Sequence, residues 1–152
     1  MRSIITITFI ILFTTPVFAE LIKPKPDIKP EKVISIQLSS LMINDDPYKN
    51  AGIEQTWEFA HPSNRAYTGP IQKFTRMMYA PSYAVMLNHL KHDILDVKLD
   101  ENTAHFFIEL TAEDGKMYGF KWTLNKVNEE GIFKNCWMTT AVSTPMPLST
   151  SS

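Results

Sequence analysis

Two runs of alternating apolar and polar residues, joined by a tight turn, constrain the fold of this 152-residue chain more than any other feature. In the runs 103–112 and 117–127, large apolar side chains stand at every second position, which is the period of a half-buried β-strand. Between them, Asp114-Gly115 favours a tight turn, because glycine tolerates the positive φ that such a turn requires. The chain is therefore predicted to contain an antiparallel hairpin with one apolar face. That face carries Phe106, Ile108 and Leu110 from the first run and Tyr118, Phe120, Trp122 and Leu124 from the second.

The first predicted helix covers residues 32–44, where apolar residues recur with helical spacing. Its apolar stripe consists of Ile34, Leu38 and Leu41. Gln37 lies off this stripe in our interpretation and is expected to face water. Asp45 and Asp46 follow directly, and their carboxylates are expected to bond the backbone of a turn rather than to act as acids or metal ligands.

Three prolines divide the next stretch of the chain into short pieces. A second helix is predicted over residues 51–60, and Pro62 should end it by pushing the preceding residue out of the α region. A third helix is predicted to begin at Thr68, whose hydroxyl can cap it, with Pro70 in its first turn. Pro81 is expected to stop this helix.

Strands are predicted for most of the remaining chain. From Tyr83 the period shifts toward two, so the segment 85–98 is predicted as a bent strand or a strand pair, and 133–142 as the last strand. Helices followed by antiparallel strands predict an α+β domain in which N-terminal helices pack on the apolar face of a curved antiparallel sheet. A curved sheet folded over a long helix leaves a conical hollow.

Both ends of the chain are expected to lie outside the domain, which is predicted to span residues 31–143. Residues 1–19 have the basic start, apolar core and small-residue cleavage box of a signal peptide. Their apolar run is shorter than the about 20 residues that span a bilayer. Residues 20–30, with interleaved prolines and lysines, are predicted to form an extended tether, and 144–152 a flexible tail. An exported protein, periplasmic or secreted, is therefore expected, with no stable membrane span after cleavage.

Charge, cysteine usage and motifs argue against several classes of protein. The formal net charge of −1 offers no basic surface for nucleic acid. Cys136 is the only cysteine, so no intramolecular disulfide is possible, and it is expected to be a buried small hydrophobic residue. The sequence contains no Gly-rich phosphate loop, Gly-x-Ser-x-Gly elbow or His-Glu-x-x-His motif. No cofactor, metal site or catalytic residue is predicted.

Four phrases of the sequence resemble an uncharacterised family of bacterial and plant plastid proteins. They are Trp57-Glu-Phe-Ala-His-Pro-Ser-Asn, Thr68-Gly-Pro-Ile-Gln-Lys-Phe, Tyr83-Ala-Val-Met-Leu-Asn-His and Cys136-Trp-Met-Thr. His61 stands where the family more often has a small residue before the proline. The resemblance spans residues 33–142 and implies the cone-shaped fold of nuclear transport factor 2-like, or cystatin-like, domains. It implies a fold and no particular site.

The histidines offer one candidate for chemistry. His89 and His92 are three residues apart, so on a strand they should point to opposite faces and should not share a metal ion. His89 is placed at the start of the sheet, where the cone opens. If it faced a carboxylate inside the cavity, it could serve as a general base; the alternative is a structural or surface histidine.

Aromatic residues with polar groups suit the wall of a ligand pocket, although they suit a plain core equally well. The predicted lining consists of Trp57, Tyr83, His89, Tyr118, Trp122 and Trp137.

Two functions follow as hypotheses. The first is a non-enzymatic exported domain that binds a small apolar ligand or a protein partner. The second is a cavity enzyme of the isomerase or dehydratase type, which requires a buried histidine or carboxylate aimed at its substrate. A homodimer through the outer face of the sheet, at His105, Phe107 and Met117, is also expected.

Overall fold

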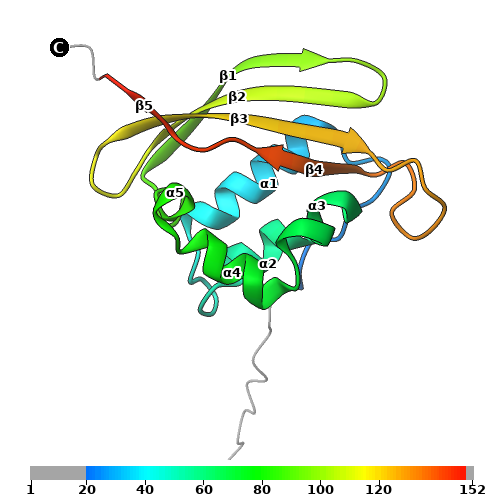
Figure 1. The fold of residues 1–152 in the computed structure, drawn as a ribbon, viewed down its shortest axis with the longest axis horizontal. Helices are drawn as coiled ribbons and strands as arrows, with labels where there is room; N and C mark the ends of the chain where they lie inside the picture. The colour runs from blue at the N-terminus through cyan, green and yellow to red at the C-terminus, as the bar shows by residue number, and fades with distance from the viewer. Residues whose placement is uncertain (1–19, 150–152) are drawn as a thin grey trace, which may run out of the picture.

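The computed structural model describes residues 20–149, which form a layer of five helices packed on one antiparallel sheet (Figure 1). The helices are α1 Pro30–Met42, α2 Ala51–Glu58, α3 Pro62–Thr68, α4 Ile71–Met78 and α5 Pro81–Ala84. The strands are β1 Lys91–Leu99, β2 Thr103–Thr111, β3 Met117–Lys126, β4 Trp137–Val142 and β5 Met146–Leu148. Helices precede strands, so the predicted α+β class is confirmed. The predicted signal peptide, residues 1–19, lies outside the described residues.

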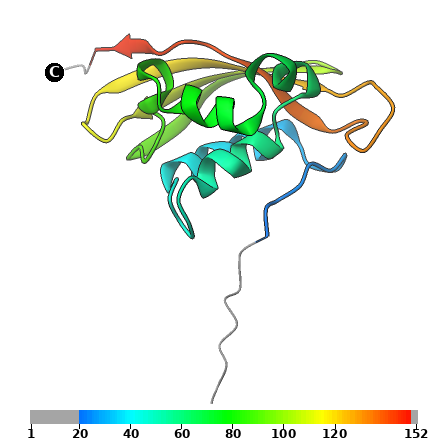
Figure 2. The same ribbon diagram turned by 60° about the horizontal axis from the view of Figure 1, so that its bottom comes forward.

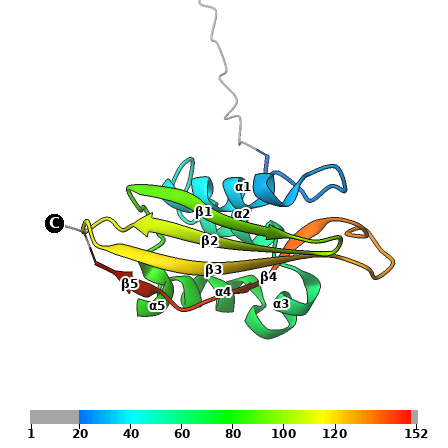
Figure 3. The same ribbon diagram turned by 90° about the horizontal axis from the view of Figure 1, so that it is seen from above.

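The sheet is an antiparallel meander in the order β1-β2-β3-β4, and β5 pairs with β3 beside β4. All the described helices lie on one face of it (Figure 2). Seen from above, the other face carries none of the five described helices (Figure 3). β1 is therefore one edge of the sheet, and β4 and β5 together form the other.

The core lies between the inner face of the central strands and the helices. The predicted alternation in β2 and β3 is confirmed, since its inward residues from Phe106 to Leu124 are almost fully buried, apart from half-buried Tyr118. Burying one large apolar side chain stabilises a fold by about 1.5–3 kcal/mol. Helix α1 supplies the opposing stripe, and Ile34, Leu38 and Leu41 are completely buried.

Helices α1 and α2 approach each other closely where Gly52 meets α1. A Cβ atom built on Gly52 would lie 2.1 Å from the carbonyl oxygen of Ser40, so only glycine fits this crossing. The loop that joins the two helices is held by Asp45, whose carboxylate accepts a hydrogen bond from Asn50 N at 2.9 Å. The predicted turn role of Asp45 is thus confirmed.

Helix α3 was not predicted, and it changes the role of Thr68. Helix α2 already ends at Glu58, so Pro62 does not end it as predicted. Pro62 instead begins α3, with His61 as the N-cap whose Nδ1 accepts a hydrogen bond from Ser63 N at 3.1 Å. The prediction that Thr68 caps the following helix is wrong. Thr68 is the last residue of α3, and its hydroxyl donates to the carbonyl oxygen of Asn64 at 2.9 Å.

The predicted strand start at residue 85 is also wrong. Pro81 begins the short helix α5, because proline is well suited to the first position of a helix. The chain then turns through Asn88, which has a positive φ of 55°, and β1 begins only at Lys91. The last long strand likewise starts later than predicted, at Trp137, after a turn in which Asn135 has a φ of 64°.

Segments near both ends contact the domain, contrary to prediction. The main-chain N–H and C=O of Ile22 bond the side-chain amide of Gln55 at 2.7 and 2.8 Å, and Lys23 pairs with Glu58 at 3.0 Å. The predicted tether therefore lies along α2. In the predicted tail, Met146–Leu148 pairs with β3 as strand β5. Among the described residues, no helix is both long enough and apolar enough to cross a bilayer.

Candidate ligand pocket

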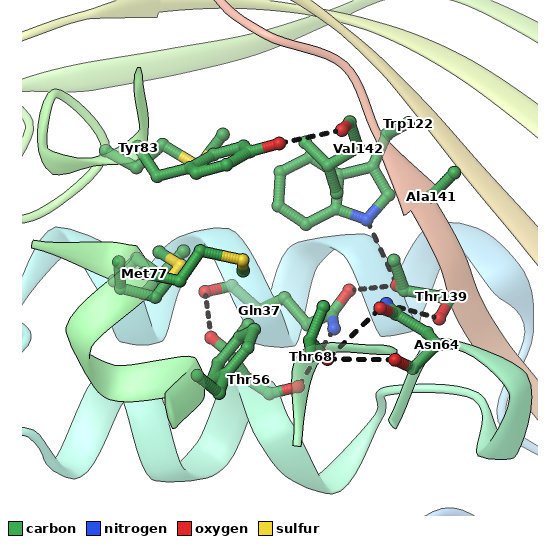
Figure 4. Close-up of a pocket in the computed structure, with 14 residues that line it drawn as sticks. Gln37, Thr56, Asn64, Thr68, Met77, Tyr83, Trp122, Thr139, Ala141 and Val142 are labelled. Atoms are coloured by element: carbon green, nitrogen blue, oxygen red, sulfur yellow. Dashed lines mark hydrogen bonds between the residues drawn. The ribbon is translucent and has the colours of Figure 1, made fainter. Parts of the chain in front are cut away.

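A pocket of about 180 Å³ lies between the helical layer and the β4 side of the sheet (Figure 4). All five helices, or the residues directly after them, contribute to its wall, so residues from Gln37 to Val142 meet there. The lining residues are Gln37, Leu41, Thr56, Asn64, Thr68, Phe74, Met77, Met78, Tyr83, Met86, Trp122, Thr139, Ala141 and Val142.

A chain of hydrogen bonds between buried side chains forms the floor of the pocket (Figure 4). The indole N–H of Trp122 donates to Thr139 Oγ1 at 3.0 Å, and this hydroxyl donates to Gln37 Oε1 at 2.7 Å. The side-chain N–H of Gln37 in turn donates to the carbonyl oxygen of Thr56 at 3.1 Å. The chain therefore ties α1 and α2 to β3 and β4 through side chains that are almost wholly buried.

A second polar group comes from α3. Asn64 Nδ2 donates to the carbonyl oxygen of Thr139 at 3.2 Å, and the Thr68 hydroxyl lies 3.3 Å from Asn64 Oδ1. The same Thr139 carbonyl accepts from His61 N at 2.8 Å. The unpredicted helix α3 thus brings two polar side chains to the pocket, and both are only partly buried.

The rest of the wall is apolar and contains three methionines, Met77, Met78 and Met86. Methionine is unbranched and polarizable, so such a wall adapts to irregular shapes. Tyr83 closes one side, and its hydroxyl donates to the carbonyl oxygen of Val142 at 3.2 Å (Figure 4).

The lining contains no Asp, Glu, His, Lys, Arg or Cys among the described residues. In the part of the chain that the structure describes, every buried side-chain nitrogen or oxygen has a hydrogen-bond partner. The pocket is therefore an uncharged cavity whose polar groups are already held in place.

Two of the six predicted lining residues, Tyr83 and Trp122, lie on this pocket. The other four do not, because each is held elsewhere. Trp57 packs against Phe74 with ring centroids 5.0 Å apart, and Trp137 lies beneath the Lys126 ammonium at 5.3 Å.

Tyr118 and His89, the remaining two, are also outside the pocket. Tyr118 stands near the far end of β3, opposite Leu110 and Pro147. His89 is buried in the turn before β1, where its Nδ1 lies 2.7 Å from the carbonyl oxygen of Met86.

The expectation that His89 and His92 point apart is wrong. His89 Nε2 lies 2.7 Å from His92 Nδ1, because the residues before Lys91 form a turn rather than a strand. The carbonyl of Met86 requires a proton on His89 Nδ1, which leaves His89 Nε2 to accept a hydrogen bond from the N–H of His92 Nδ1. Burial lowers the pKa of both imidazoles below the ordinary value. The ring nitrogens of His89 contact Met86 O and His92 Nδ1 and no carboxylate of the described residues, so the arrangement does not match the predicted general base.

Gln37, Thr139, Asn64 and Thr68 were not identified as site residues from the sequence. For Gln37 the prediction of a water-facing side chain is wrong, since it is 1% exposed. A signal was present, because position 37 is three residues after Ile34 and four before Leu41 and so shares their helical face. Thr139 gave no comparable signal.

The described residues contain no group of three or more His, Cys, Asp or Glu side chains that could hold a metal ion. Cys136 is buried, as predicted, and burial raises the pKa of its thiol. Comparison of the chain with protein-family models, with curated proteins and with solved structures found no significant match.

Proposed function

We propose that this chain is an exported binding domain that holds a small, neutral, largely apolar molecule in the pocket between its helices and β4, without converting it chemically. One observation carries the proposal: the pocket has an apolar wall, a fixed polar floor and no charged side chain among its lining residues. Ligand sites in proteins typically combine apolar walls with a few well-placed polar groups.

Size and polarity define the class of ligand. A cavity of about 150 Å³ is large enough to bind benzene, so the 180 Å³ here suits a molecule of about one ring. Each of Gln37 and Asn64 has a side-chain amide with two N–H donors, and only one hydrogen bond to a protein acceptor is present for each. The ligand is therefore a single-ring compound with a hydroxyl or carbonyl oxygen that accepts a hydrogen bond from a remaining N–H group of Gln37 or Asn64.

The alternative, a cavity enzyme of the isomerase or dehydratase type, lacks a comparable observation in its favour. Such chemistry requires an acid or base with a matched pKa beside the substrate. The pair of buried His89 and half-buried His92 stands outside the lining residues, and the lining itself contains no carboxylate or imidazole. The geometry thus favours binding.

Export is part of the proposal and rests on the sequence of residues 1–19. Mass spectrometry of the protein from producing cells is expected to find a chain that begins at Glu20. A chain that retains Met1 in the membrane fraction would contradict the cleaved signal.

Binding is tested with phenol and benzene as probes. Methyl NMR of methionine-labelled protein is expected to show saturable shifts for Met77, Met78 and Met86 with both probes, and tighter binding of phenol. Methionine signals that do not respond to either probe at millimolar concentration would overturn the proposal.

A matched pair of substitutions shows whether these shifts report the pocket. Ala141→Phe should abolish them, because Ala141 lines the pocket and is exposed at its rim. Ala66→Phe, at an exposed position of α3 outside the lining, should not. Equal effects of the two substitutions would place the probes elsewhere.

A further inference from the structure

The two edges of the sheet differ in how they are closed. At the β4 edge, Thr139 N donates to Phe59 O at 2.7 Å and Thr139 O accepts from His61 N at 2.8 Å, so the segment before α3 occupies the main chain there. At the other edge, β1 pairs with β2 alone among the described residues. A strand with an unpaired edge is a template for another strand.

The β1 edge also concentrates exposed apolar surface. Half of the exposed large hydrophobic residues of the described chain belong to residues 90–99. Their exposed fractions are 55% for Leu90, 38% for Ile94, 56% for Leu95, 42% for Val97 and 53% for Leu99. Scattered apolar residues are normal on a protein surface, but a cluster along one unpaired strand indicates an interaction site.

Two charged residues of β1, Asp96 and Lys98, form no ion pair within the described chain. Asp96 stands opposite Phe107 and Lys98 opposite His105, which places both on the outer face of the sheet. Neither forms an ion pair with another described residue, whereas Lys91 and Asp93 pair with each other at 2.9 Å.

The hydrogen-bond direction along β1 fixes which residues can pair outward. Asp100 N donates to Thr103 O at 3.0 Å, so Asp100 directs its main chain toward β2. Main-chain direction alternates along an antiparallel ladder. Val97 and Leu99 therefore direct their N–H and C=O groups away from β2, toward the unpaired edge.

We propose that β1 pairs antiparallel with β1 of a second copy of this chain, with Val97 opposite the partner's Val97 on the two-fold axis. In this register Val97 forms a hydrogen-bonded pair with the partner's Val97, because the N–H and C=O groups of both residues point toward the unpaired edge. Asp96 stands opposite the partner's Lys98, and Lys98 opposite the partner's Asp96, so the free charges form two cross-strand pairs. Leu99 stands opposite the partner's Leu95, which covers apolar surface at both ends.

The two neighbouring two-fold registers lack this complementarity. If the two-fold axis passes through Asp96, the carboxylate of Asp96 lies directly opposite that of the partner's Asp96. Centring the pair on Lys98 sets two ammonium groups against each other and Asp96 against the partner's Asp100. Like charges directly opposite each other destabilise a strand pair, so charge selects the register centred on Val97.

Charge reversal tests the proposal in solution. Analytical ultracentrifugation of the wild-type protein is expected to show a dimer that dissociates on dilution. Asp96→Lys and Lys98→Asp, each alone, should raise the dimer Kd by about 10- to 100-fold, because each replaces two attractive cross-strand pairs by repulsive ones. The combined variant Asp96→Lys/Lys98→Asp recreates both pairs and should restore the wild-type Kd. Glu113→Lys, in the exposed turn between β2 and β3, is the matched control and should leave the Kd unchanged.

Crosslinking tests the register itself. Cys136 is buried, so its thiol should not react with a crosslinker. Val97 is exposed, so Val97→Cys introduces a thiol that a crosslinker can reach. A short thiol-to-thiol crosslinker should join two Val97→Cys chains, since opposed Cα atoms in a hydrogen-bonded pair are about 5.5 Å apart. Lys121→Cys, an exposed position on β3, should not crosslink. A monomer at all concentrations would overturn the proposal. So would a dimer whose Kd is unchanged by both charge reversals, or whose Kd rises instead with Phe107→Asp on the outer face.

Discussion

The hydroxyl of Thr139 donates a 2.7 Å hydrogen bond to the side-chain oxygen of Gln37, a residue 102 positions earlier in the chain. This bond joins the first helix to the fourth strand inside the core. Because the same hydroxyl accepts the indole N–H of Trp122, Thr139 satisfies two buried groups at once.

Thr139→Val should therefore destabilise the fold more than the loss of one hydrogen bond. The shape of the side chain is kept, but Gln37 Oε1 and Trp122 Nε1 both lose a partner in a buried setting. An unsatisfied buried polar group costs about 1–3 kcal/mol, so urea unfolding should show a loss of about 2–4 kcal/mol. Thr140→Val, one residue away and partly exposed, should cost less than about 1.5 kcal/mol because water can replace its lost bonds. Equal losses for the two variants would contradict this account.

The His89–His92 pair should make stability depend on pH. Burial is the largest cause that lowers the pKa of both folded imidazoles, and Asp93 only partly opposes it for His92. The unfolded chain, with a histidine pKa of about 6.5, therefore binds more protons as the pH falls below that value. Stability is complete above about pH 7 and decreases below about pH 6.5, by up to about 1.4 kcal/mol per pH unit for each histidine that stays neutral in the folded state.

Urea unfolding between pH 7.5 and 5.5 measures this slope. His89→Gln can still donate to the carbonyl of Met86 but does not titrate, so it should reduce the slope. His105→Gln removes a histidine on the exposed outer face, outside the pair, and is the matched control. A wild-type slope that His89→Gln does not change would show that the histidine pair is not responsible.

Arg65 caps the end of α2, and lysine should not replace it. Its guanidinium donates to the carbonyl oxygens of Trp57, Glu58 and Ala60 at 2.9 Å each, and it lies over the Trp57 ring at 5.0 Å. An ammonium cannot reproduce this planar fork. Arg65→Lys is expected to cost about 2–3 kcal/mol in urea unfolding, since hydrogen bonds to charged groups contribute about 1.5–3 kcal/mol. Arg76→Lys, at an exposed position of α4, should change stability by less than about 0.5 kcal/mol; a loss similar to that of Arg65→Lys would refute the capping role.

Gly52 should be the least replaceable glycine of the chain. Alanine at this position would place its Cβ 2.1 Å from Ser40 O, a main-chain atom that cannot move without separating α1 from α2. Gly52→Ala is expected to cost more than about 3 kcal/mol or to prevent folding, as judged by circular dichroism and thermal unfolding. Gly115→Ala is the comparison, because no atom lies within 4 Å of its Cβ and only its positive φ of 83° is unfavourable. It should cost about 1 kcal/mol, and equal costs would mean that crowding at Gly52 is relieved.

Strands β2 and β3 and the first helix were predictable because each repeats a pattern over many residues. The alternation of apolar and polar residues from Phe106 to Leu110, followed by the turn signal Asp114-Gly115, is compatible with few structures other than a β-hairpin. The failures lie where a proline was interpreted only as the end of a helix. Pro62 and Pro81 were each expected to stop a helix, but Pro62 begins α3 and Pro81 begins α5. The spacing of apolar residues does not indicate either of these helix starts.

The pocket was less predictable than the fold, because it depends on meetings between distant segments. Of the residues proposed from the sequence as a ligand-site lining, Tyr83 and Trp122 lie on the pocket. The polar floor depends on Thr139, whose role appears only when β4 lies beside α1 and α3. The contact between His89 and His92 likewise depends on the left-handed turn at Asn88, which places two rings together that a regular strand would separate.

The hydrogen bonds between Ile22 and Gln55 determine the side from which the described chain enters the domain. The blue segment at the start of the described chain lies with the helical layer, away from the bare face of the sheet (Figure 1). A dye, affinity handle or solid support joined at Glu20 would therefore project on the side opposite to that face. Immobilisation through this residue would leave the whole outer surface of the sheet accessible to an incoming molecule.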